Sequence, residues 1–356
     1  MKKTISNIVK LIVFLSITVF LIIVLGKAFT PTGWKDNYQG QIYTIKGIEE
    51  IPNNSIDVLF LGASSFQKSI SPMQVYEETG ISSYNYSISS ARIYMMYYFL
   101  QDILKTQKPK VVMVDIITLF YKSREEETEQ RKSFDYNDLD LIKLKMINDD
   151  VFDTTFEEKA SYIFPLLRYH SRWDELKIRE VKDSFARYES NTRGFLMSNK
   201  LKSNHKGWSY MQPSDKKVFM QDYVSEYFYK FVELCKKNDI EVVFVGIPDV
   251  RAWNYASSKE MAKLAKETNT VFLDLNDEVK CPLDWLTDTE DGGYHMNIKG
   301  AQKITHAISK FFNENYKFNR EQTLEERDYW NKNLIIYNNH VEKNMKILNR
   351  RIKENN

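Results

Sequence analysis

The chain has 356 residues, of which 50 are lysine or arginine and 48 are aspartate or glutamate. The length allows one large domain or two modest ones with a sizeable core. Because the charges nearly cancel, no net positive field favours nucleic acid as a partner. The two cysteines, Cys235 and Cys281, form no CxxC pair or other metal-ligand spacing. We therefore expect plain thiols, with a disulfide between them as the minor alternative.

An apolar segment near the N-terminus predicts a membrane anchor. Residues 11–25 carry no charge, and the stretch extends to 8–28 if Lys10 and Lys27 reach toward the membrane surfaces. No small-x-small cleavage site follows, which favours an uncleaved anchor over a signal peptide. More lysines precede the segment than follow it. We therefore expect a single-pass protein of the cell membrane, with its N-terminus cytoplasmic and everything beyond residue 30 outside.

Short apolar runs after the anchor predict a parallel sheet. Four runs are rich in β-branched residues and apolar on both faces: 56–63, 110–117, 240–247 and 270–276. A fifth run, 82–89, is weaker. Continuous hydrophobicity suits strands that are covered on both sides. Helical patterns alternate with these runs, at 92–106, 219–237 and 258–267. This alternation indicates an open α/β sheet.

The predicted organisation has three parts: residues 1–30 as anchor, 31–317 as an α/β domain and 318–356 as a helical tail. About 120 residues separate the run at 110–117 from the run at 240–247, whereas a crossover needs only about a dozen. Residues 120–238 are therefore predicted to be a helical insertion that caps the functional edge of the sheet; a surface excursion without a role is the alternative.

In the tail, apolar residues recur at spacings of three and four, which predicts an amphipathic helix packed back on the domain. A short coiled coil or docking to a membrane partner is the alternative there.

The candidate chemistry centres on one histidine. None of the twelve glycines falls into GxGxxG, GxxxxGK or GxSxG, and HExxH is absent. Of the five histidines, His295 is the one that follows a cluster of acids, Asp288, Glu290 and Asp291. An acid close before a histidine can fix its tautomer, and such a pair can activate a serine hydroxyl. A structural histidine is the plain alternative. A metal site with these acids is a weaker one, because no second histidine stands at ligand spacing.

Ser64 ends the first predicted strand and offers a nucleophile. In an open parallel sheet, ligands bind beyond the carboxyl ends of the strands. The His295 loop follows the last predicted strand and reaches the same edge, so Ser64, Asp291 and His295 are expected to converge. By itself, Ser64 could equally be a turn residue or a helix cap.

Two segments, "LFLGASSF" near the start and "DGGYHMNIKGAQK" near the end, resemble the first and last blocks of the SGNH (GDSL) hydrolase superfamily. The anchor and "HSRWDEL" resemble, more narrowly, its extracytoplasmic members. These include the D-alanyl-lipoteichoic acid biosynthesis protein family and the SGNH proteins of exopolysaccharide O-acetylation. The resemblance covers roughly residues 55–313. It implies a flavodoxin-like, three-layer α/β/α fold with Ser64 as nucleophile, His295 as base and a nearby aspartate that orients the histidine.

The chain departs from the superfamily pattern in three places. The superfamily usually places the acid three residues before the histidine, where this chain has Gly292. Asp291 is our choice for the acid and Asp288 the second choice. The second-block glycine is missing, so a backbone N–H of Ser89 or Ser90 is expected to serve as oxyanion donor. The third-block asparagine is not visible. Losing one donor costs about 2.7–4 kcal/mol of transition-state stabilisation, which suits a transferase better than a hydrolase.

Together these features predict a membrane-anchored, extracytoplasmic serine acyltransferase or esterase. The resemblance implies acetyl or D-alanyl esters of a cell-surface polysaccharide or teichoic acid as substrates, with no cofactor and no metal. It also implies a multi-pass membrane-bound O-acyltransferase as a partner. Two alternatives stay open: a catalytically inactive glycan-binding or scaffolding subunit with the same fold, and a tethered general esterase or lipase.

Overall fold

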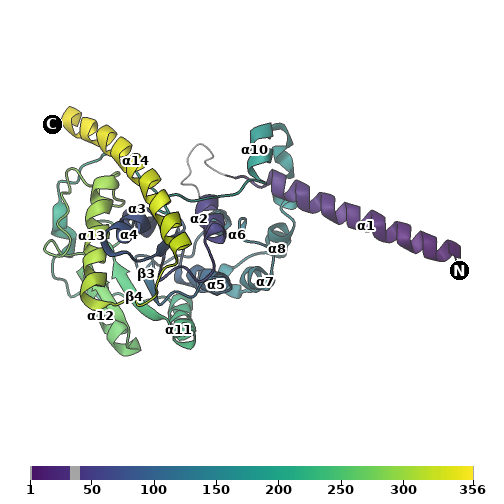
Figure 1. Ribbon diagram of the computed structural model, residues 1–356. Helices are drawn as coiled ribbons and strands as arrows, with labels where there is room; N and C mark the ends of the chain where they lie inside the picture. Colours follow the sequence, from purple (N-terminus) through teal and green to yellow (C-terminus); the bar gives the residue numbers. More distant parts are fainter. Residues whose placement is uncertain (1, 33–40, 356) are drawn as a thin grey trace.

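The computed structural model describes residues 2–32 and 41–355. Its centre is a five-stranded, all-parallel sheet with the strand order β2-β1-β3-β4-β5 (Figure 1). The strands are β1 (Val58–Gly62), β2 (Ser83–Ser87), β3 (Val111–Asp115), β4 (Glu241–Gly246) and β5 (Val271–Asp274). The predicted parallel α/β sheet is confirmed, and the weak run at 82–89 forms the strand β2 at one end of it.

Burial on both faces explains the continuous hydrophobicity of the strands. β1, β2 and β3 are buried along their whole length, and β4 is buried after its first residue. Successive side chains enter opposite layers: Leu59 and Leu61 join one hydrophobic cluster, whereas Val58 and Phe60 join the other. A strand in this position has no solvated face, so it shows no polar alternation.

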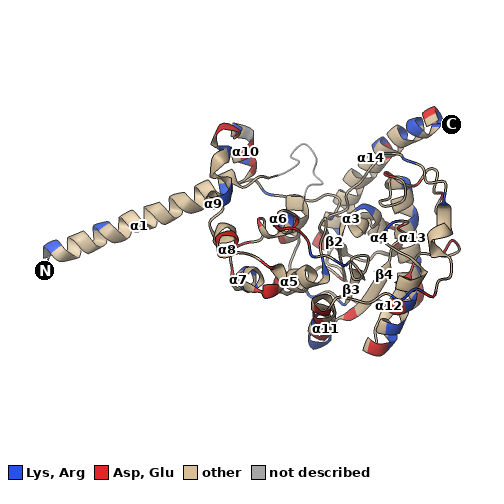
Figure 2. Cartoon of the chain, turned by 180° about the vertical axis from the view of Figure 1, so that it is seen from behind, with Lys and Arg blue, Asp and Glu red and all other residues tan. Residues whose placement is uncertain are grey.

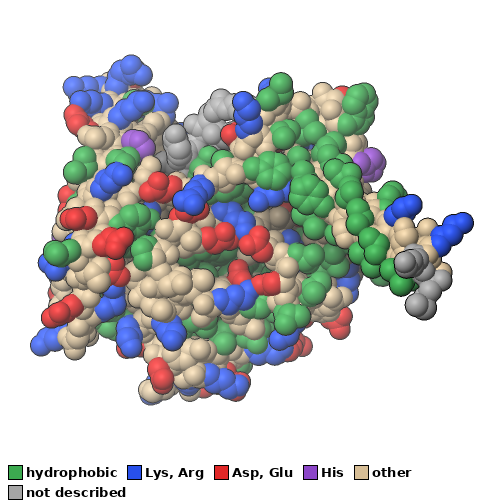
Figure 3. Space-filling model, turned by 45° about the vertical axis from the view of Figure 1, so that its right-hand side comes forward, with side chains coloured by type: hydrophobic (Ala, Val, Ile, Leu, Met, Phe, Trp, Pro, Cys, Tyr) green, Lys and Arg blue, Asp and Glu red, His purple; other side chains and the backbone are tan. Residues whose placement is uncertain are grey.

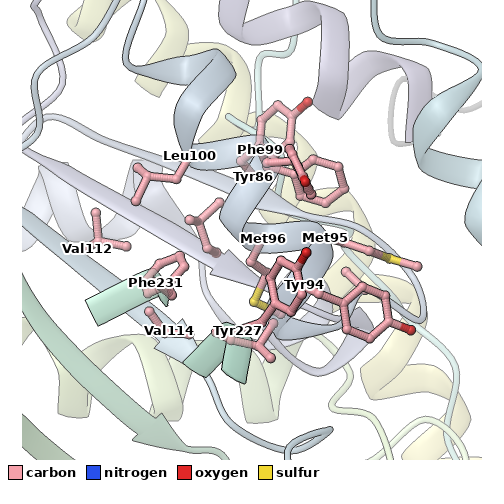
Figure 4. Close-up of a cluster of buried hydrophobic side chains, with 14 of the residues drawn as sticks. Tyr86, Tyr94, Met95, Met96, Phe99, Leu100, Val112, Val114, Tyr227 and Phe231 are labelled. Carbon is pink, nitrogen blue, oxygen red and sulfur yellow. The ribbon is translucent and has the colours of Figure 1, made fainter. Parts of the chain in front are cut away.

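Helices cover both faces and make three layers. One face is covered by α5 (Ile93–Ile103), α11 (Asp222–Lys237) and α12 (Tyr255–Thr268). Figure 4 shows this core, in which Tyr86, Tyr94 and Tyr227 lie among aliphatic side chains. The other face is covered by α3 (Ser64–Ser69), α4 (Pro72–Thr79) and α13 (Ile298–Asn315). Thus most of the aromatic side chains near β2 and α5 are core.

The tail is the long helix α14 (Leu324–Asn355), which lies outside α4 and α13 (Figure 1). Its side chains Trp330, Tyr337 and Leu348 are buried in the same cluster as α13. Trp330 stacks on Tyr76 of α4, with ring centroids 5.0 Å apart. The helix therefore packs back on the domain, as its apolar spacing predicts.

Short helices precede β1 and fill the long connection from β3 to β4. Before β1 lie α2 (Gln41–Gly47) and η1 (Ile48–Glu50). The connection holds α6 (Glu127–Phe134), α7 (Leu141–Asn148), η2 (Asp150–Phe152), α8 (Phe156–Ile163), α9 (Leu166–Tyr169), η3 (His170–Asp174), α10 (Ile178–Asp183) and η4 (Gly207–Met211). In Figures 1 and 2 the helices from α6 to α10 lie between the sheet and the N-terminal helix.

The N-terminal helix α1 (Lys2–Phe29) projects from the rest of the molecule (Figure 1). Within the described chain it is the one helix long and apolar enough to cross a membrane, over Lys3–Phe29. Figure 2 shows its charged residues, in blue, toward the two ends, with an uncharged stretch between them. Residues 33–40, which belong to the predicted start of the α/β domain, lie outside the described residues.

Candidate active site

Ser64 begins helix α3 directly after strand β1, with Ala63 as the extended residue between them. This strand-to-helix turn is tight: a Cβ on Gly62 would lie 2.7 Å from the Cβ atoms of Asp115 and Phe66. Only glycine fits such a close approach. The N–H of Ser64 belongs to the first turn of the helix, where N–H groups have no acceptor within the helix. The turn therefore presents both a hydroxyl and a backbone donor at the carboxyl edge of the sheet.

Asp115, at the end of β3, holds this turn in place. Its Oδ2 accepts hydrogen bonds from Ala63 N (3.1 Å) and from the Ser65 hydroxyl, and its Oδ1 accepts from Ile117 N (3.0 Å). The carboxyl is buried, and burial raises its pKa despite these hydrogen bonds. The sequence analysis missed this residue, although an acid that ends an otherwise apolar strand was a signal for it.

His295 lies on the loop between β5 and α13. Hydrogen bonds accepted by Asp291 fix the conformation of that loop. Asp291 Oδ1 accepts from the backbone N–H groups of Tyr294 (3.1 Å) and His295 (2.9 Å). Gly292 and Gly293 have φ angles of 91° and 100°, a region that glycine adopts without steric cost. The turn places the carboxylate of Asp291, four residues before His295, against the imidazole of His295.

The structure brings Ser64, His295 and Asp291 into one hydrogen-bonded line. His295 Nε2 lies 2.8 Å from Ser64 Oγ, and His295 Nδ1 lies 2.7 Å from Asp291 Oδ2. Burial alone would raise the pKa of Asp291, but hydrogen bonds from the His295 side chain and backbone lower it to about 2. An ionised Asp291 holds the proton on Nδ1, which leaves Nε2 free to accept the hydroxyl proton of Ser64.

Asp288, the second choice for the acid, lies elsewhere. Its side chain is fully buried, with Oδ2 2.6 Å from Lys303 Nζ and Oδ1 3.5 Å from Lys299 Nζ. Its Oδ2 also accepts from the N–H of Asp284 at 2.7 Å. These contacts tie the loop to the first turns of α13, so Asp288 supports the loop rather than the imidazole.

The third acid of the cluster, Glu290, forms an ion pair with Lys68 of α3. Its Oε1 also lies 3.9 Å from His295 Nδ1. Glu290, Asp291 and His295 each offer a ligand atom, all within 4.8 Å of one another. However, the Lys68 ammonium group neutralises Glu290, and both imidazole nitrogens already have partners. The arrangement therefore fits proton transfer better than metal binding.

Ser89 and Ser90 follow strand β2 at the same edge, where Ser87 pairs with Gly62 of β1. The Ser89 N–H donates to Gln41 Oε1 of α2 at 3.3 Å. The Ser90 hydroxyl donates to Glu129 of α6 at 2.7 Å, and Ser90 has a φ of 64°. This segment thus lies next to the Ser64 turn, but the Ser89 donor is bonded to a side chain that no sequence pattern indicated.

The segment after β4 supports the His295 loop from another side. Val250 N donates to Gly293 O (3.0 Å), and the Arg251 guanidinium donates to Asp291 O (2.8 Å). Asp249 is fully buried; its Oδ1 accepts from Arg251 N, and its Oδ2 has no partner within the described residues. Burial, with the negative charges of Asp115 and Asp291 added, raises the pKa of Asp249 to about 7.

Comparisons with family models and with curated proteins find no match for the chain. Among the solved structures that match is the crystal structure of a candidate acylhydrolase from Bacteroides fragilis. The two chains are 10% identical, the match covers 75% of this chain and 92% of that one, and the TM-score is 0.36. At this identity and TM-score the likeness does not extend to function.

Proposed function

We propose that this protein is a membrane-anchored serine esterase or O-acyltransferase of the SGNH type. The observation that carries the proposal is the line from Asp291 through His295 to Ser64, with contacts of 2.7 and 2.8 Å. Its order matches an acid that orients, a base that accepts a proton and a hydroxyl that attacks. The two sequence blocks that resemble the superfamily contain these same three residues.

The geometry supports a two-step acyl transfer. Ser64 Oγ attacks the ester carbonyl while His295 Nε2 takes its proton, and the Ser64 N–H faces the developing oxyanion. Collapse expels the first alcohol, to which His295 returns the proton, and leaves an acyl ester on Ser64. A second alcohol then gives its proton to His295 and attacks the acyl carbon; as the new ester leaves, His295 returns the proton to Ser64 Oγ. With water as the acceptor, the same steps amount to hydrolysis.

The engaged second oxyanion donor predicts a slow hydrolase, which is compatible with a transferase that keeps water from its acyl intermediate. The Ser89 N–H is bonded to Gln41, and freeing it for the oxyanion costs about 1 kcal/mol, the net value of a neutral hydrogen bond. We assign acetyl or D-alanyl esters of a cell-surface polysaccharide or teichoic acid as substrates, and a membrane-bound O-acyltransferase as the partner. These assignments follow the family resemblance together with the apolar helix α1, which would leave the domain outside the membrane.

The same engaged donor favours one second candidate, a catalytically inactive subunit that binds glycan. In that case the Ser64–His295 contact would be a structural hydrogen bond, and Gln41 would keep the Ser89 N–H permanently occupied.

Fluorophosphonate labelling of the full chain in its membranes separates the candidates. An active site gives an adduct on Ser64, found by mass spectrometry, that is absent from Ser64→Ala. Ser209, which is exposed, provides a matched control, because Ser209→Ala should label like the native chain. Absence of any adduct in intact membranes would favour the inactive subunit. Turnover of a soluble acetyl ester with and without added glycan then distinguishes a general esterase from a transferase.

A further inference from the structure

Five large apolar side chains around the end of α1 are exposed to solvent. They come from the segment that contains α9, η3 and α10, and we call them the apolar platform: Phe164, Leu167, Trp173, Ile178 and Phe185. The most prominent are Trp173 and Ile178, which are 73% and 78% exposed. Single exposed apolar residues are ordinary, but several gathered in one region mark an interaction surface.

Direct contacts fix this segment to the last turns of α1. Gly26 packs on Pro165, since a Cβ there would lie 3.4 Å from the proline ring. The Lys27 ammonium group lies 5.5 Å from the centre of the Phe185 ring, and the Arg172 guanidinium donates to Phe29 O. The helices α9, η3 and α10 all pack against α1. The segment that carries the apolar platform therefore packs against the end of α1, the helix suited to span a membrane.

The length of α1 places the platform at the membrane surface. Its 28 residues extend about 42 Å at 1.5 Å per residue, more than the roughly 30 Å of a bilayer's hydrocarbon core. The helix is largely exposed as far as Leu25, whereas Gly26 and Ala28 are buried against protein. Protein contact thus begins where a spanning helix leaves the hydrocarbon. Figure 3 shows hydrophobic side chains that continue from this helix onto the adjoining surface.

We infer that the apolar platform rests in the interfacial region of the lipid bilayer and holds the catalytic domain against the membrane. Tryptophan is favoured at that depth because its ring is amphipathic, and phenylalanine and leucine are typical of the apolar faces that enter the boundary between headgroups and acyl chains. The exposed charges Asp174, Glu175 and Lys177 have mixed sign, which suits a zwitterionic headgroup layer. This inference rests on the proposed role of α1 as an anchor.

The platform also sets the position of the candidate active site. Helix α6 connects the two: Glu129 accepts from Ser90 beside the site (2.7 Å), and Glu127 accepts from Arg168 of α9 (3.2 Å). A domain held at two points, by α1 and by the platform, cannot rotate freely relative to the membrane. The site then stays at a fixed height above the lipid, which suits an acyl acceptor presented at the membrane surface.

Nitroxide labels on introduced cysteines test the inference. The native Cys235 and Cys281 are fully buried, so an exposed new cysteine is labelled selectively. Trp173→Cys and Ile178→Cys report the platform, Ile17→Cys reports α1, and Val279→Cys is the matched control, an apolar residue 92% exposed on a loop after β5. All four substitutions are at exposed positions, which protects the fold. The full chain is reconstituted in dioleoylphosphatidylcholine vesicles, and collisions with oxygen and with a water-soluble nickel complex are measured.

The expected result is a ratio of oxygen to nickel collisions several-fold higher at Trp173 and Ile178 than at Val279. If the platform labels match the Val279 label while the Ile17 label is lipid-like, the platform inference is overturned and the anchor stands. If the Ile17 label is also water-like, the anchor fails and the inference with it. Fluorophosphonate labelling of Ser64 in the same samples tests the active site independently of either result.

Discussion

Polar side chains cluster at both edges of the sheet, where the strands begin (the amino edge) and where they end (the carboxyl edge), and the two clusters differ in their contacts. At the amino edge, Arg320 binds Asp57 (2.9 Å), Glu326 (2.9 Å) and the Ser55 carbonyl (2.8 Å). Asp57 and Arg320 also line a cavity of about 530 Å³ there. At the carboxyl edge, the line from Asp291 through His295 ends on the hydroxyl of Ser64. This cavity is not lined by Ser64, Asp291 or His295, so it lies apart from the candidate active site.

The difference shows what each edge does. Arg320 precedes α14, and its contacts join the tail to the start of the sheet. The amino-edge cluster therefore stabilises the fold. At the carboxyl edge, Ser64 begins helix α3, whereas Asp249 and His295 lie in loops where carboxylates accept hydrogen bonds from backbone N–H groups. Substitutions at the amino edge should change stability, and those at the carboxyl edge should change chemistry. The following experiments test that separation.

The largest effect is expected for Asp291→Asn. The amide cannot hold the proton on His295 Nδ1 as a carboxylate does, so the rate of fluorophosphonate labelling at Ser64 should fall by about 10²–10⁴-fold. The fold should persist, because the backbone N–H bonds can still be accepted by the amide oxygen. Labelling rates measured from pH 5 to 9 provide the check.

Asp288→Asn is the matched control for that substitution. It weakens a buried ion pair with Lys303, which should lower the free energy of unfolding by about 3 kcal/mol. Labelling of the folded protein should stay within a few-fold of native. Equal losses of labelling rate in both variants would contradict the assignment of Asp291 as the orienting acid.

Much of this arrangement could be predicted from the sequence, and the failures have physical causes. Continuous apolar runs predict buried parallel strands whose carboxyl ends share an edge. Together with the family resemblance, this pattern made Ser64 and His295 candidates, and the structure places them 2.8 Å apart. Spacing alone could not choose between Asp291 and Asp288, because the positive φ angles of Gly292 and Gly293 decide which acid faces the imidazole.

The roles of the supporting residues could not be predicted for a different reason, although the place of Asp115 at the end of an apolar strand was a signal for that residue. Asp115, Gln41 and Asp249 act through contacts with segments far away in the chain. Gln41 stands in a short helix without any catalytic pattern around it, so nothing local marks it as the acceptor for the Ser89 N–H. Such roles depend on tertiary placement, which hydrophobic periodicity does not encode.

The second largest effect is a pH dependence of stability caused by Asp249. Its pKa is about 7 in the fold, above the ordinary value of 3.8, so the folded state binds the proton more tightly than the unfolded state. The stabilisation is complete below pH 4 and is lost as the pH rises through 7. At 1.36 kcal/mol per pKa unit, the loss is on the order of 4 kcal/mol.

Urea unfolding of the full chain in detergent at several pH values measures this loss. Asp249→Asn removes the titrating proton and keeps an acceptor for Arg251 N, so its stability should change less between pH 4 and 8. Parallel pH curves for the native chain and the variant would show that Asp249 is not the responsible group.

A smaller effect is expected at the amino edge. Arg320→Ala leaves the buried Asp57 carboxylate without its guanidinium partner, which should lower the free energy of unfolding by about 3 kcal/mol. Below its unfolding temperature the variant should label at Ser64 at the native rate. Arg320→Lys keeps one charge and should recover part of the stability. A loss of labelling without a loss of stability would join the two edges functionally and refute their separation.

The smallest effect concerns the engaged donor at the carboxyl edge. Gln41→Ala removes the acceptor of the Ser89 N–H, which then becomes available to the oxyanion. A neutral hydrogen bond has a net value of about 1 kcal/mol, so labelling of Ser64 should accelerate about fivefold. Gln41→Glu keeps the acceptor and adds a negative charge near the oxyanion, so it should slow the reaction. If Gln41→Ala labels at the native rate, the Ser89 N–H is not an oxyanion donor. The backbone N–H groups of Ser64 and Ser90 would then be the remaining candidates among the donors considered.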